Sequence, residues 1–181
     1  MKPCKSCPFR KDSRHGLWSA AHYLLVAYLQ SADIPSLPSM GCHQYNGKVK
    51  PSLKAEVSPY CGGWIRAAKD NVAIGIRVAF GRIDNDEIHD GYDVMSPEEM
   101  AKTNGIDMTR VPALRFDHRN QDVQSYVEWL NEHTELRNRL RADPEYARTF
   151  IVPGSPLANP PGQAEVDEIF GIDNAYQQDQ P

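Results

Sequence analysis

The stretch Pro3-Cys4-Lys5-Ser6-Cys7-Pro8 opens the chain with two cysteines that are separated by two residues. Two further cysteines follow in Gly41-Cys42-His43 and Tyr60-Cys61-Gly62-Gly63-Trp64, and the rest of the 181-residue chain contains none. A Cys-x2-Cys turn directs two thiolates toward one point, and two single cysteines can complete a tetrahedral zinc site or hold the corners of an iron–sulfur cluster. The spacing therefore predicts one metal centre, with these ligands: Cys4, Cys7, Cys42 and Cys61.

The cellular compartment helps to choose among three interpretations of the cysteines. No secretory signal follows Met1 and no stretch approaches membrane-spanning length, so we expect a cytoplasmic protein without a membrane partner. Thiols in a reducing cytosol favour metal binding over a disulfide or redox-active pair and over unligated cysteines. Cysteines supplied singly, and Pro8 directly after Cys7, favour a 4Fe-4S cluster, while Zn2+ stays open as the alternative.

Several short motifs in residues 1–82 resemble a known family. They are Pro3-Cys4-x-x-Cys7-Pro8-Phe9-Arg10, Cys42-His43-Gln44 and Cys61-Gly62-Gly63-Trp64. This pattern, PCxxCPxR with CHQ and C[AG]GW, resembles small bacterial and bacteriophage proteins that are known only as a domain of unknown function. The resemblance implies that the four cysteines act together in a small intracellular protein of bacteria or their phages, with His43 close by. It implies no reaction.

His43 is the histidine that the sequence singles out. Beside a ligand, its ring can hydrogen-bond to a ligand sulfur from the second shell, or it can replace a cysteine as an alternative ligand. The other five histidines show no paired ligand spacing, so we expect surface or structural roles for them.

The net charge of -4 hides a strong asymmetry. Residues 1–69 hold ten Lys or Arg against three acidic residues, whereas residues 70–181 hold ten against 21. Four thiolates around Zn2+ or a 2+ cluster subtract about two charges and leave the first part basic. A basic N-terminal face suits nucleic acid or an acidic protein partner. The alternative is that the two parts neutralise one another within the fold.

Hydrophobic periodicity predicts a mainly α protein. A capping Ser19 precedes an apolar stripe that runs to Gln30. Ser96-Pro97-Glu98-Glu99 begins a helix that ends near Thr103 and is closed by Asn104-Gly105. A longer helix is expected from Gln121 to Arg141, capped by Asn120. Its predicted buried side consists of Val123, Val127, Leu130, Leu136 and Leu140.

Residues 63–80 fit two different periods. Toward residue 80, every second side chain is large and apolar, which suits a strand. Apolar residues also recur at every fourth position along the segment, which suits a helix. We prefer one continuous helix from Gly63 to Phe80 that stops at Gly81. In that arrangement Cys61 directly precedes the helix N-terminus, where the helix dipole favours a thiolate.

The C-terminal tail differs from the rest. Residues 153–181 contain several Pro and Gly residues, five acids and no base. Residues 164–172 can dock as a short amphipathic helix onto a partner or onto the basic half, but the default expectation for this composition is a plain disordered tail. We expect one small domain in three parts: a cysteine metal-binding module (1–82), a helical part packed on it (83–152) and an irregular acidic tail (153–181).

These patterns favour a metal-binding, non-catalytic interaction or regulatory protein that engages nucleic acid or a protein partner. Enzyme motifs such as a phosphate loop, a nucleophile elbow or His-Glu-x-x-His are not found, which argues against catalysis without excluding it. The alternative is a metalloenzyme acting on nucleic acid or in redox chemistry, with His43 and a carboxylate such as Asp12 near the metal. A third reading is a thiol switch with a reversible Cys4–Cys7 disulfide.

Overall fold

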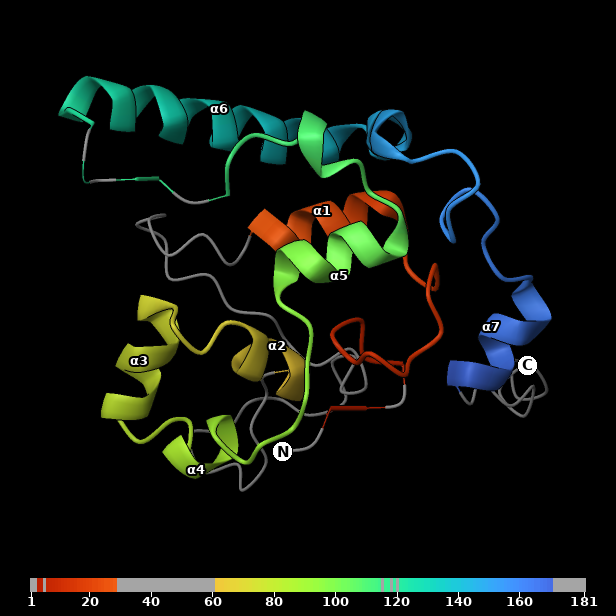
Figure 1. Cartoon of the computed structure of the whole chain (residues 1–181), viewed down its shortest axis with the longest axis horizontal. Helices are drawn as coiled ribbons and strands as arrows, with labels where there is room; N and C mark the ends of the chain where they lie inside the picture. Colours follow the sequence, from red (N-terminus) through yellow and green to blue (C-terminus); the bar gives the residue numbers. More distant parts are fainter. Residues whose placement is uncertain are drawn as a thin grey trace, which may run out of the picture.

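The computed structural model describes residues 3–4, 6–28, 61–114, 116–117, 119 and 121–170. Within these ranges the chain is mainly helical and has no β-strand, as predicted, and two isolated β-bridges join Arg10 to Val94 and Ile106 to Ile151. The helices appear in Figure 1. They are α1 (Ala20–Tyr28), α2 (Gly62–Ala67), α3 (Val72–Ala79), α4 (Asn85–Ile88), α5 (Pro97–Asn104), η2 (Met108–Arg110), α6 (Val123–Ala142), η3 (Pro144–Phe150) and α7 (Gln163–Phe170).

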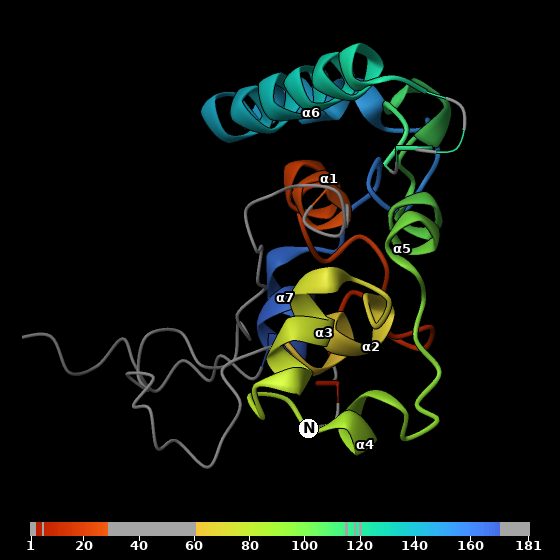
Figure 2. The same cartoon turned by 90° about the vertical axis from the view of Figure 1, so that its left-hand side faces the viewer.

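Helix α1 is central to the fold. The Ser19 hydroxyl accepts a hydrogen bond from His22 N at 3.2 Å, which confirms the predicted cap. Seven of its nine residues are buried, and it contacts α5, α6 and η3. In both views α1 lies between α6 on one side and the α2–α4 segment on the other (Figure 2). The predicted helix end at residues 29–30 and the loop at 44–59 lie outside the described residues.

Helix α5 forms as the sequence predicts. The Ser96 hydroxyl accepts a hydrogen bond from Glu99 N at 3.1 Å, and Pro97 occupies the first turn. Gly105 follows with φ 101°, a left-handed conformation that favours glycine and ends the helix.

Helix α6 confirms the predicted long helix but begins at a different cap. The Asp122 carboxylate accepts a hydrogen bond from Ser125 N at 2.9 Å, so the cap is Asp122 and the prediction of Asn120 is wrong. Asn and Asp are both good N-cap residues. The N-cap is the residue whose side chain reaches the free N–H groups of the first turn, and here that residue is Asp122.

The buried face of α6 also differs from the prediction. Val123 and Val127 are 79% and 41% exposed, and the buried residues of the helix are Trp129, His133, Leu136 and Leu140. Trp129 anchors this face, because its Nε1 donates to Ala113 O at 2.9 Å. A buried indole removes more apolar area from water than a valine does, so it determines which way the first turns of the helix face.

The predicted single helix at residues 63–80 is two helices, α2 and α3. Ala68 ends the first, and a new helix starts where Asn71 O accepts from Ile74 N at 2.9 Å. Asp70 and Asn71 favour turns and caps over helix interiors, which explains the break. The predicted four-residue stripe splits accordingly, since Trp64 and Ala68 are buried whereas Val72, Ile76 and Phe80 are exposed.

The choice between helix and strand for residues 72–80 is settled in favour of helix, because α3 covers residues 72–79. The predicted stop at Gly81 is confirmed by its φ of 63°, and Gly81 N donates to Val78 O at 2.9 Å.

The C-terminal part returns to the start of the chain. Arg14 Nε lies 3.1 Å from Glu165 Oε1 of α7, so this part of the tail forms the short helix that was the alternative to the default of a disordered tail, and it pairs with the basic half. A Cβ on Gly16, which has φ 77°, would lie 2.7 Å from Pro156 O, so this approach requires glycine. One apolar core extends from Cys7 to Leu157 and takes side chains from all three predicted parts, whose boundaries stay a prediction.

Candidate metal centre

The Cys-x2-Cys motif folds into a tight turn. Cys7 N donates to Cys4 O at 3.1 Å, and Arg10 N donates to Cys7 O at 3.1 Å, which makes two successive turns. Trp18 Nε1 donates to Ser6 O at 3.3 Å and attaches the turn to the segment before α1. The turn is therefore held by hydrogen bonds to the backbone carbonyl oxygens of Cys4, Ser6 and Cys7.

Cys61 approaches this turn from α2. It is the N-cap residue, with extended backbone angles of φ -67° and ψ 120°. A hydrogen bond from the Cys7 thiol, together with bonds from Trp64 N and Gly63 N, lowers the pKa of Cys61 to about 7. The predicted position of Cys61 just before a helix N-terminus is confirmed.

Cys7 lies between the other two thiols. Hydrogen-bonding contact with Cys4 and then with Cys61, together with burial, raises the pKa of Cys7. Cys7 and Cys61 are 0% and 2% exposed, and Cys4 is half-buried. Three cysteines from two distant segments thus meet in one place.

Gly63 permits this close approach. A Cβ at this position would collide with the Cys7 sulfur and would lie 3.2 Å from the ring of Phe9. The backbone of the first turn of α2 therefore packs directly on the thiol, which is the physical reason for a glycine two residues after Cys61.

The predicted ligands Cys4, Cys7 and Cys61 are gathered, whereas Cys42 and His43 lie outside the described residues. In the ranges that the structure covers, no group of three or more His, Cys, Asp or Glu side chains has the geometry of a metal site. The chemistry of the gathered residues nevertheless fits a thiophilic metal, because cysteine sulfurs are the donors that such metals prefer and these are buried or half-buried. The ligand set stays a prediction.

A partly buried ion pair at the C-terminal end of α2 was missed by sequence reasoning. Arg66 is 4% exposed, and its guanidinium donates to Gly62 O at 2.7 Å and to the Asp90 carboxylate, with Nε 3.0 Å from Oδ1. This pairing lowers the pKa of Asp90 to about 2. An arginine inside an otherwise apolar segment was the available signal, but its partner lies far along the chain.

Of the five basic residues in 1–69 that the structure describes, four form ion pairs with acids. Three of the four acids concerned come from the acidic part of the chain. The pairs are Arg10–Asp12, Lys11–Asp93, Arg14–Glu165 and Arg66–Asp90. Among the described residues, this pattern supports mutual neutralisation of the two parts over an open basic face.

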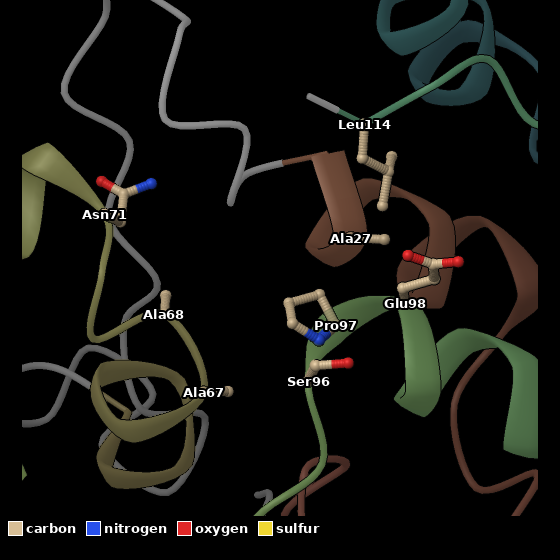
Figure 3. A pocket seen from close by; sticks show the side chains of 8 residues that line it. All are labelled: Ala27, Ala67, Ala68, Asn71, Ser96, Pro97, Glu98 and Leu114. Atoms are coloured by element: carbon tan, nitrogen blue, oxygen red, sulfur yellow. The ribbon is translucent and has the colours of Figure 1, made fainter. Parts of the chain in front are cut away.

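A cavity of about 320 Å³ lies between α1, α2 and the start of α5 (Figure 3). Its eight described lining residues include no cysteine or histidine, and it meets α2 at the end away from Cys61. The cavity is therefore separate from the thiols. The lining residues are Ala27, Ala67, Ala68, Asn71, Ser96, Pro97, Glu98 and Leu114.

Fold and site together define a small, mainly helical protein that gathers thiols near its N-terminus. The chain belongs to the family described as "Family of unknown function (DUF6283)", whose profile matches residues 1–118. The match includes all four cysteines and extends beyond residue 82, through α5 and η2. No curated protein and no solved structure matches the chain. Among the helices described here, none is long and apolar enough to cross a membrane.

Proposed function

We propose that this protein is a metal-binding, non-catalytic interaction or regulatory protein. The supporting observation is the contact of Cys7 with both Cys4 and Cys61, three cysteines that come from two segments. Cys42 is the proposed fourth ligand, and His43 is the proposed alternative ligand or hydrogen-bond partner of a ligand sulfur. A bound metal would link the N-terminal turn to α2 and contribute directly to folding.

The surroundings of the thiols support a structural role. Structural metal sites have a closed set of protein ligands, whereas catalytic sites keep one position open. Cys7 and Cys61 are buried, and the backbone of Gly63 covers the Cys7 sulfur. The metalloenzyme alternative depends on His43, which lies outside the described residues, so no contact supports it.

The proposed partner is a protein, with nucleic acid as the second candidate. Arg10, Lys11 and Arg14 each have an acidic partner within the chain. A nucleic acid would have to compete with these ion pairs, and we expect its binding to be weak. Lys69 and Arg82 are exposed and remain accessible to an acidic protein surface.

The test is the zinc and iron content per chain of the wild type and of Cys42→Ser, both purified without oxygen. We expect one metal centre in the wild type and its loss in Cys42→Ser, together with lower thermal stability. Ser39→Ala is the matched control from the same segment and should keep the metal. A wild-type protein that folds without zinc or iron would overturn the proposal.

A further inference from the structure

Helix α3, at the left edge of the described helices in Figure 1, is apolar on two faces, and one of them is exposed. On the inner face, Ile74 is 1% exposed and Val78 is half-buried, and both pack on the core. The outer face has the i, i+3, i+4, i+7, i+8 spacing of one helix surface, and its residues are all exposed. They are Val72, Gly75, Ile76, Ala79 and Phe80. A helix that is apolar on both faces is typical of a buried element, so the outer face indicates an interaction surface.

The outer face is continuous and allows another helix to approach closely. Phe80 N donates to Ile76 O at 3.0 Å, so Phe80 continues the last turn of α3. Val72 at one end is 57% exposed, and Phe80 at the other is 77% exposed. A Cβ on Gly75 would meet nothing within 4 Å. Glycine destabilises a helix interior, and its small size at the centre of this face permits a short distance between two helix axes.

The outer face is symmetric about Ile76. Val72 and Phe80 lie four residues to either side of it. In an antiparallel pair with a two-fold axis at Ile76, the smaller Val72 of each copy lies beside the larger Phe80 of the second copy. Such a self-complementary interface closes at two subunits. We propose that the protein forms a weak symmetric dimer in which two α3 helices pack antiparallel through their outer faces.

Charged residues at the two ends of the face favour the same orientation. Asp70 and Arg82 are exposed and lie six residues to either side of Ile76. The antiparallel arrangement brings Asp70 of each copy near Arg82 of the second copy, whereas a parallel arrangement brings like charges together. Exposed Lys69 and Asp84 extend the same pattern, one at each end. Exposed ion pairs contribute little affinity, so these charges mainly determine the orientation.

The size of the face determines the expected strength of the dimer. Helix α3 has eight residues, and a pair of such helices buries less than the roughly 1,200 Å² of a stable interface. The dimer should therefore form at high protein concentration and dissociate on dilution. The inference goes beyond the metal-binding function proposed above, because it depends on α3 and not on the thiols.

Sedimentation velocity of the full chain, with a reductant present, tests the dimer. From about 10 μM to about 1 mM, the wild type should shift from monomer toward dimer. Phe80→Glu should weaken association by about tenfold or more, because it places a charge in the apolar interface. Val123→Glu is the matched control, since Val123 of α6 is 79% exposed, and it should associate like the wild type. A wild type that stays monomeric, or a Phe80→Glu variant that associates equally well, would overturn the dimer. Metal content of the same samples tests the metal-binding function separately.

Charge reversal tests the antiparallel orientation. Asp70→Arg and Arg82→Asp should each weaken the dimer by about three- to tenfold, because each creates two like-charge contacts across the axis. The double variant restores opposite charges and should return close to the wild-type affinity. Both side chains are exposed, so the fold should be unchanged, which a circular dichroism spectrum checks. Single variants that match the wild type, or a double variant at least as weak as either of them, would overturn this arrangement.

Discussion

The region around α1 and the region around the thiols are stabilised in different ways. Helix α1 buries seven of its nine residues and contacts α5, α6 and η3, so ordinary apolar packing holds this region together. Helix α2 has only six residues and α4 only four. Isolated helices of that length are unstable in water, and they depend on contacts with other elements.

The thiol region compensates with links between distant side chains. Cys61 meets Cys4 and Cys7 at one end of α2, and Arg66 pairs with Asp90 at the other. The two regions should therefore respond differently to mutation. Loss of a ligand or an ion partner should affect α2 and its neighbours, whereas loss of a cap or a core contact should affect the helices around α1.

Cys61→Ser should have the largest effect. Structural zinc sites contribute apparent binding free energies of about 10–16 kcal/mol to small domains, so losing one ligand should remove several kcal/mol of stability. Hydrogen exchange should show lost protection in α2 and α3 and retained protection in α1, α5 and α6. Ala67→Ser, which adds a serine at the far end of α2, is the control. Equal loss of protection in both regions would contradict the comparison.

Asp90→Asn should have the next largest effect, because it leaves the buried Arg66 guanidinium without its anionic partner. The pairing lowers the pKa of Asp90 to about 2, below the value of about 3.9 for an unfolded chain. Its contribution is therefore present above pH 4 and is lost as the pH falls toward 2.

The measurement is the urea midpoint of wild type and Asp90→Asn at several pH values. The difference between them should be greatest at neutral pH and should shrink between pH 4 and 2. Asp86→Asn replaces an exposed carboxyl in the neighbouring α4 and should show no comparable difference at any pH. A difference that is constant with pH would argue that packing, and not charge, is lost at Asp90.

A smaller effect should come from His133 in the α1 region. The ring is 0% exposed, its Nδ1 lies 2.9 Å from Trp129 O, and burial lowers its pKa. Because the unfolded chain binds a proton near pH 6.5, wild-type stability should fall as the pH drops from 7 to 5. His133→Phe should reduce this decline.

Thermal unfolding at pH 7 and pH 5 measures the decline for each protein. His89→Phe alters an exposed histidine and should keep the wild-type dependence on pH. Metal content should be the same in both variants at pH 7, because neither residue contacts a thiol among the described residues. If His133→Phe kept the full decline, the buried ring would not be its source.

The sequence predicted those elements that carry their own local signals. Ser19, Ser96 and Gly105 sit at helix boundaries, and the structure confirms each because caps act within a few residues. The convergence of Cys4, Cys7 and Cys61 also followed from their type and spacing. All four ligand assignments, Cys42 included, and the partner assignment remain predictions.

Features set by long-range contacts could not be predicted in the same way. The split between α2 and α3 occurs at Asn71, a residue type that disfavours helix interiors. The apolar residues that recur every four positions across this point predicted one continuous helix instead. The buried face of α6 is determined by Trp129 and its hydrogen bond to Ala113 O. The spacing of apolar residues along the helix does not reveal this bond. The buried pairing of Arg66 with Asp90 likewise requires the folded chain, since either side chain alone suggests a solvent-exposed charge.

Ser96→Ala should have the smallest effect and gives the sharpest test of separation between the two regions. It removes the hydroxyl that accepts from Glu99 N at 3.1 Å and should cost about 1 kcal/mol, the usual value of an N-cap. Thr103→Ala changes an exposed residue of the same helix and should leave stability within about 0.5 kcal/mol of wild type. Chemical unfolding measures both variants. Metal content should be unchanged, since α5 packs against α1. If Ser96→Ala lowered metal content, the two regions would be coupled.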